Sequence, residues 1–159
     1  MISAPTPIAE DAAAARERPR LPAGLADRAG FLLAKAHLAA RQVADPTLAP
    51  LGLDVKQYGT LMVLASEGPL SQQTVGELLP CDRTTMVALV DSLEAKAYVE
   101  RRRNPSDRRA YALHITPAGR RALARAKKLM ASAESELLAP LSAAEVRQLK
   151  RLLQRLLTP

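Results

Sequence analysis

Five arginines lie close together in one short stretch of the chain, with one aspartate among them. They are Arg101, Arg102, Arg103, Arg108 and Arg109. Guanidinium groups this close repel one another unless an anion lies between them, and arginine pairs bidentately with phosphate. Asp107 is placed to hold and order the Arg109 guanidinium through such a pair. The stretch therefore predicts a phosphate-binding site, and a turn-capping aspartate beside solvated arginines is the alternative.

A second candidate site is the run Arg83-Thr84-Thr85, which follows Asp82 at the expected start of a helix. Arginine binds guanine edges or phosphate, and threonine offers a hydroxyl and a methyl group that fits thymine. We expect Asp82 to cap this helix and the next three residues to contact DNA. Ser71 and Gln72 begin the preceding helix, where backbone amides suit a phosphate.

The elements that position these residues follow from hydrophobic periodicity. Apolar residues at three- and four-residue spacing predict helices over about 24–43, 55–66, 72–79, 83–95 and 117–139, and a last helix after Ser142. Residues 98–103 and 109–115 read as two short strands around a turn. Two short helices joined by a tight turn and followed by a β-hairpin predict a winged helix-turn-helix in a mainly α fold.

The net charge of +7 is concentrated in one segment. Lys96–Lys128 holds eleven Lys or Arg residues against two acidic residues, whereas the remainder of the chain carries a small negative excess. This distribution is typical of a surface that binds a polyanion. Solubility or chance is the alternative explanation.

Several classes of function find no support in the sequence. There is no glycine-rich phosphate loop, no metal-ligand spacing and no long apolar segment, and His37 and His114 are isolated. We therefore expect no enzyme, metal or cofactor, and a cytoplasmic protein without a membrane segment or signal peptide. The single cysteine, Cys81, precedes a helix start near Arg83, which favours a reactive thiol, but a small buried thiol filling the turn is the preferred interpretation.

Residues 70–122 resemble the MarR family of transcriptional regulators. The matching segments are Leu70-Ser71-Gln72, Asp82-Arg83-Thr84-Thr85, Leu89–Glu94, Asp107-Arg108-Arg109 and Ile115–Gly119. The wider resemblance covers about residues 24–157, including terminal helices that build the dimer in this family. Two features depart from the family: Ala97 replaces a common glycine after the recognition helix, and Val87-Ala88 is apolar where relatives place polar residues.

The resemblance implies a homodimer that binds double-stranded DNA at a palindromic operator, acting as a repressor that a small aromatic or anionic effector releases. It implies recognition-helix positions at residues 83–85, and it implies that Asp107 orients Arg109 for contact with the minor groove. Arg101, Arg103 and Arg108 are further candidate DNA contacts because they lie on the same basic hairpin. The resemblance also implies an effector pocket, for which a phenolic compound or aromatic carboxylate is the expected ligand. The candidate pocket residues are His37, Arg41, Tyr58 and Met62.

The expected organisation is a loose or partly helical arm over residues 1–22, a dimerisation helix over 23–50, a DNA-binding lobe over 51–116 and dimerisation helices over 117–159. Three alternatives remain open. The winged helix could dock an acidic protein, the regulator could act without an effector, or Cys81 could sense oxidants.

Overall fold

The computed structural model describes residues 21–79, 81–104 and 107–158, and the side chains of residues 104–110 lie outside this description. Most of the expected N-terminal arm, residues 1–20, also lies outside it. The chain divides into two compact units, residues 1–35 and 36–159, which we describe separately. In the first unit a turn, closed by the Leu25 amide on the Pro22 carbonyl at 2.9 Å, precedes the first helix.

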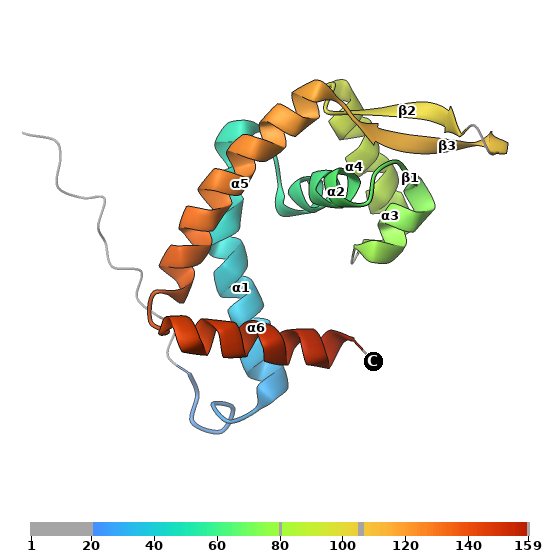
Figure 1. The fold of residues 1–159 in the computed structure, drawn as a ribbon. Coiled ribbons are helices and arrows are strands. Elements are labelled where there is room, and N and C mark those ends of the chain that lie inside the picture. The colour runs from blue at the N-terminus through green and yellow to red at the C-terminus, as the bar shows by residue number, and fades with distance from the viewer. Residues whose placement is uncertain (1–20, 80, 105–106, 159) are drawn as a thin grey trace, which may run out of the picture. The chain divides into compact units, whose positions relative to one another are not determined.

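The fold is mainly helical with one small sheet, as the sequence predicts (Figure 1). The helices are α1 (Ala29–Leu48), α2 (Val55–Ser66), α3 (Gln72–Leu78), α4 (Arg83–Ala95), α5 (Pro117–Leu138) and α6 (Ala143–Leu157), with a 3₁₀ turn at Ala49–Leu51. The strands are β1 (Leu70–Ser71), β2 (Val99–Asn104) and β3 (Asp107–Ile115). The element order α3, α4, β2, β3 is that of a winged helix-turn-helix.

The first helix differs from its predicted bounds. It begins five residues later than expected and continues through Pro46 to Leu48, although proline removes a helical hydrogen bond. The Thr47 hydroxyl donates to the Val43 carbonyl at 2.7 Å, and Leu48 is fully buried in the core. Burial of the last turn therefore outweighs the local cost of the proline.

The helix caps explain why the other helices begin where the sequence predicts. Asp54 and Gln57 form a reciprocal capping box at the start of α2, with the Gln57 amide donating to Asp54 Oδ1 at 2.7 Å. Ser142 and Glu145 form the same arrangement at the start of α6. Each cap satisfies backbone amides that have no partner within the helix.

The sheet has the order β1-β3-β2, and both pairings are antiparallel. The central pairing of β2 with β3 runs from Val99 opposite Ile115 to Asn104 opposite Asp107. β1 was not predicted, because a two-residue strand shows no alternation; it pairs Leu70 with Leu113. Pairing with β1 ties the hairpin to the start of α3.

One core lies beneath the helix-turn-helix and the base of the hairpin. Its fully buried side chains come from α1, α2, α3, α4, β2 and β3, and they include Leu48, Leu61, Leu64, Val75, Val90, Leu93, Val99 and Leu113. Because α4 and the base of the hairpin share this core, they form one lobe.

The junction between α4, β2 and α5 is tightly packed. Ala97 adopts a left-handed conformation with φ of 55°, at the position where the family commonly carries glycine. The Thr116 hydroxyl caps α5 and donates to the Ala97 carbonyl at 2.6 Å. Gly119 lies so close to the Tyr98 carbonyl that a Cβ there would overlap its oxygen.

Candidate nucleic-acid interface

The start of α4 is built by Asp82. Its Oδ1 accepts the Thr85 amide at 2.9 Å, and its Oδ2 accepts the Thr85 hydroxyl at 2.5 Å, which confirms the predicted cap. The hydrogen bonds from the Thr85 side chain and backbone lower the pKa of Asp82. Thr85 is half-buried, and its hydroxyl is therefore engaged within the protein and not directed at a ligand.

Arg83 and Thr84 are the exposed residues of the first turn of α4. Beside them a cavity of about 480 Å³ separates α3 from α4. Its lining consists of Gln72, Gln73, Gly76, Glu77, Cys81, Arg83 and Met86. Arg83 is thus exposed and lines the cavity between the two helices, and its contact with nucleic acid stays a prediction.

At the start of α3, Ser71 acts as the cap. Its Oγ accepts the Thr74 amide at 3.0 Å and lies 2.8 Å from the Thr74 hydroxyl. The first turn of α3 follows directly with Gln72 and Gln73, of which Gln73 is exposed. The predicted role of Ser71 as a helix start is confirmed, and its contact with phosphate stays a prediction.

The arginines of the β2–β3 hairpin, which forms the wing, differ in exposure and in their partners. Arg103 is exposed, and Arg102 pairs with Glu100 of the same strand at 2.5 Å. The backbone of Asp107, Arg108 and Arg109 belongs to β3, but their side chains lie outside the description. The expected pair between Asp107 and Arg109 therefore stays a prediction.

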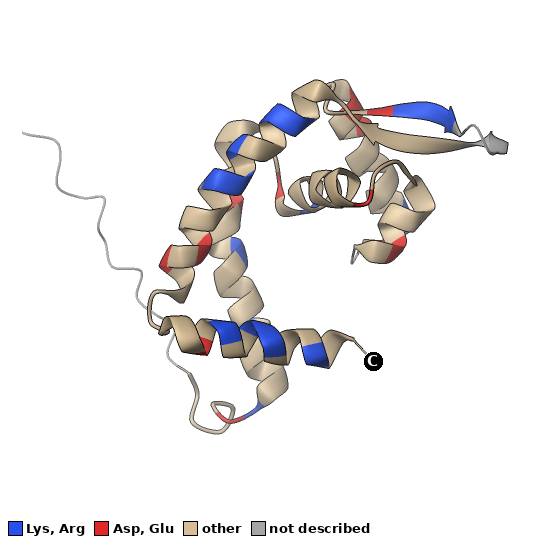
Figure 2. Ribbon diagram, in the orientation of Figure 1, with Lys and Arg blue, Asp and Glu red and all other residues tan. Residues whose placement is uncertain are grey.

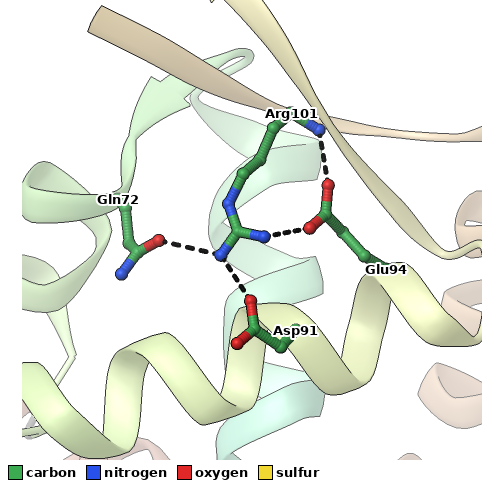
Figure 3. A network of polar contacts seen from close by, with 4 residues as sticks. All are labelled: Gln72, Asp91, Glu94 and Arg101. Atoms are coloured by element: carbon green, nitrogen blue, oxygen red, sulfur yellow. Dashed lines mark hydrogen bonds and ion pairs between the residues drawn. The ribbon is translucent and has the colours of Figure 1, made fainter.

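Arg101 is a second predicted site residue, after Thr85, whose side chain is engaged within the protein. Its guanidinium is turned toward the helices and pairs with Glu94 and with Asp91, the latter at 2.7 Å (Figure 3). It also donates to Gln72 Oε1 at 3.2 Å. The side chain is only 28% exposed, so Arg101 and Gln72 are engaged with each other inside the lobe.

Asp91 and Glu94 were not singled out from the sequence. They lie three residues apart on α4 and so face the same side of the helix. Two carboxylates on one face of a helix, just ahead of a highly basic segment, are the signal that could have found them. The sequence alone does not show which arginine they hold.

Positive charge extends from the hairpin onto α5. Figure 2 shows a continuous basic stretch on β2 and further basic turns along the first half of α5. The residues on α5 are Arg120, Arg121, Arg125, Lys127 and Lys128, all exposed. The concentration of charge seen in the sequence is therefore also a concentration in space.

The candidate effector residues separate into two groups. His37 and Arg41 line a cavity of about 230 Å³ between α1 and α5, together with Val55, Met130 and Glu134. Arg41 also pairs with Asp45 at 2.9 Å. Tyr58 and Met62 instead pack against the core. Burial of Tyr58, together with the nearby Glu134, raises its pKa.

The described residues also bear on thiol chemistry, metal binding and membrane insertion. Cys81 is a free, half-buried cysteine. Within residues 21–79, 81–104 and 107–158, histidine, cysteine and acidic side chains form no group suited to a metal ion. In the same part of the chain no helix has both the length and the apolar character needed to cross a bilayer.

Known proteins resemble this chain in both sequence and fold. Residues 51–110 match the model of the MarR family. A regulatory protein assigned to the hcr operon of Thauera aromatica is 38% identical, with 83% of this chain and 80% of the relative covered. An HTH-type transcriptional repressor of Mycobacterium tuberculosis is 30% identical, with 84% and 97% covered.

Among solved structures, the transcriptional repressor CouR bound to a 23-mer DNA duplex superimposes with a TM-score of 0.81. It is 31% identical, and the match covers 88% of this chain and all of the CouR chain. CouR from Rhodococcus jostii has also been crystallised with p-coumaroyl-CoA, with a TM-score of 0.76 at 30% identity over 85% of this chain and 95% of that one. The chain belongs to the MarR family of transcriptional regulators.

Proposed function

We propose that this regulator binds a palindromic operator as a homodimer, represses transcription and is released by a small aromatic or anionic effector. The observation that carries the proposal is the exposed Arg83-Thr84 turn at the start of α4, the helix that is followed by a hairpin whose strands hold five arginines. The first turn of the second helix enters the major groove in this motif, and a narrow basic hairpin suits the minor groove. CouR, which shares this fold, binds a DNA duplex.

The direct contacts we assign are fewer than the sequence predicts. Arg83, Thr84 and Arg103 have side chains that are free to reach DNA. Arg108 and Arg109 are assigned by their position in the hairpin, and Asp107 is assigned to orient Arg109. Arg101 is bound by acidic side chains and is not assigned a direct contact.

The homodimer is supported by helix α6. Its apolar residues recur along one face at Val146, Leu149, Leu153 and Leu156, yet no residue of this helix is buried. An apolar seam of this kind packs on another helix. We assign α1, α5 and α6 to the dimerisation region, whose two-fold symmetry would match a palindromic operator.

The effector is assigned to the cavity between α1 and α5. Its lining is mostly apolar, and Arg41 and His37 supply donors for a carboxylate. A volume of about 230 Å³ exceeds the roughly 150 Å³ that accommodates benzene in an apolar cavity. CouR was crystallised with p-coumaroyl-CoA, an aromatic ligand, which makes this compound a suitable probe.

The proposed function is tested by footprinting the purified protein on the DNA that flanks its own gene. We expect protection of two half-sites about one helical turn apart. The logarithm of the affinity should fall linearly with the logarithm of the salt concentration, by about 0.9 per neutralised phosphate. Failure to bind duplex DNA of any sequence in dilute buffer would refute the proposal.

Effector release is tested separately on the same operator. A panel of aromatic carboxylates, p-coumaroyl-CoA and a mild oxidant is added to the preformed complex. We expect an aromatic anion to release the DNA and Arg41→Met to abolish that release without changing DNA affinity, whereas Lys56→Met on the exposed side of α2 changes neither. Release by the oxidant alone, lost in Cys81→Ser, would instead support redox sensing.

A further inference from the structure

The Arg101 network joins three elements of the DNA-binding lobe. Arg101 extends from β2, Asp91 and Glu94 lie on α4, and Gln72 begins α3 (Figure 3). The Arg101 backbone amide also donates to Glu94 Oε1, at 2.9 Å. Glu94 therefore binds both the main chain and the side chain of one residue, which fixes β2 relative to α4 in position and in direction.

The network lies near the base of the hairpin, so a change there alters the direction of the whole hairpin. Arg101 pairs with Leu113 of β3, and Leu113 pairs in turn with Leu70 of β1. Beyond this level Arg102 turns to Glu100 of its own strand and Arg103 is exposed. A strand rises about 3.3 Å per residue, so the hairpin projects roughly 10 Å from Arg101 to its last β2 residue. A small rotation at Arg101 is thus magnified at the tip.

The charges in the network are not arranged for a direct phosphate contact. Arg101 has two carboxylates as partners, so the group as a whole carries a net negative charge. The Asp91 side chain is 58% exposed, and an unpaired carboxylate there would repel a phosphate backbone. Direct attraction to DNA therefore does not explain the two acidic side chains on α4, and they must serve another role.

We propose that Arg101 is a positioning residue, which sets the direction of the wing relative to the recognition helix through Glu94, Asp91 and Gln72. Arg101 acts on DNA through the orientation of the wing arginines and does not itself touch the phosphates. This inference rests on the proposed DNA-binding function. It makes an unusual prediction, namely that removing a negative charge from the lobe weakens the binding of a polyanion.

The test compares Arg101→Gln, Glu94→Gln and the double variant on the operator by fluorescence anisotropy at constant salt. Each single change is expected to lower affinity about tenfold, and the double variant no more than Arg101→Gln alone, because that change already removes the contact with Glu94. Glu67→Gln, an exposed acid at the end of α2, is the charge-matched control and should bind as the wild type or slightly more tightly. Unchanged or increased affinity of Glu94→Gln, or losses that multiply, would overturn the proposal.

Two further measurements separate positioning from a purely structural role. In Arg101→Gln, hydroxyl-radical footprints should lose minor-groove protection under the wing and keep protection under α4. In the free protein, ¹⁵N relaxation should show increased motion of the β2 and β3 amides but not of α4. Uniform loss of protection together with a rigid hairpin would refute positioning.

A milder variant keeps the test decisive if Arg101→Gln or Glu94→Gln does not fold. Asp91→Asn removes only the exposed carboxylate and leaves the Glu94 pair in place. We expect about threefold weaker operator binding, and tighter binding would contradict the proposal. Absence of operator binding by the wild type would count against the proposed function itself, so the two failures are distinguishable.

Discussion

At the scale of single residues, direct DNA contact depends on which basic side chains remain free. Arg83 is exposed at the first position of α4, beside the cavity between α3 and α4. Arg101 has the same charge but is bound by two carboxylates. Net charge therefore identifies a binding surface, whereas the hydrogen-bond partners decide which residues touch the ligand.

Replacement of Arg83 by alanine is expected to weaken operator binding by about 1–3 kcal/mol. The change removes a donor that reaches guanine or phosphate and leaves the Asp82 cap in place. Titration of the operator by anisotropy measures the loss, and Lys56→Ala on α2 serves as a control of equal charge. Equal losses in the two variants would mean that Arg83 acts only through net charge.

The Asp82 cap predicts a defined pH dependence of stability. Its pKa is lowered in the folded protein, so its stabilising contribution is present above the ordinary aspartate pKa of about 3.9 and disappears as the pH falls through the lowered value. Asp82→Asn retains a capping side chain but cannot ionise. The melting temperature of the wild type should exceed that of the variant at pH 7, and the difference should disappear as the pH falls through the lowered pKa of Asp82. A difference that is independent of pH would exclude an ionised cap.

At the scale of elements, the sequence predicts helices and strands well where a cap or a repeating period marks them. Helices α2, α4, α5 and α6 begin at the residues that the sequence predicts, and each follows a side chain that caps it. The end of α1 was misplaced, because the burial of Leu48 overrides the local signal of Pro46. The missed strand β1 exists only through its pairing with β3, which no local pattern encodes.

The candidate site was likewise predictable only where local sequence signals define it. Residue types and turn positions located the recognition helix and the basic hairpin. The partner of each arginine depends on distances across elements, so the sequence could not distinguish the internal Arg101 from the exposed Arg103. Likewise, only the packing shows that His37 and Arg41 line a cavity whereas Tyr58 packs against the core.

The junction of β2 with α5 predicts a large effect from a small substitution. A Cβ at Gly119 would overlap the Tyr98 carbonyl oxygen and lie 2.9 Å from its carbonyl carbon. Gly119→Ala should therefore lower the free energy of unfolding by about 1–3 kcal/mol, since the backbone must move. In Gly76→Ala the new Cβ meets only Met86 at 3.9 Å, so the same substitution should stabilise helix α3. Urea denaturation measures both, and a shared sign would contradict this account of the packing.

Ala97 offers the opposite test at the same junction. Its φ of 55° lies in the left-handed region, which costs a residue with a Cβ about 1–2 kcal/mol. Glycine removes this strain but has greater freedom in the unfolded chain. Ala97→Gly should raise the free energy of unfolding by about 0.5–1 kcal/mol in the same assay. A loss of stability would show that the alanine methyl group packs favourably.

At the scale of the whole molecule, the exposed seam of α6 connects folding to operator recognition. Helix α6 fully buries none of its residues and leaves most of its leucines exposed, although burying one such side chain contributes about 1.5–3 kcal/mol. A second copy of the chain would cover this seam, and in a two-fold symmetric dimer each contact would form twice. A dimer would also place two recognition helices on one duplex, so that the second contact is made at a high effective concentration.

Replacement of both Leu149 and Leu153 by glutamate is therefore expected to produce a folded monomer. Because neither residue is buried within the chain, the substitutions should leave its secondary structure intact by circular dichroism. Analytical ultracentrifugation should show the halved mass, and operator affinity should fall by about 10²–10⁴-fold as the second contact is lost. Gln148→Glu adds charge away from the seam and should remain a dimer with wild-type affinity. If the double variant stayed dimeric, α6 would not be the interface; if it were monomeric and still bound the operator tightly, recognition would not require two copies.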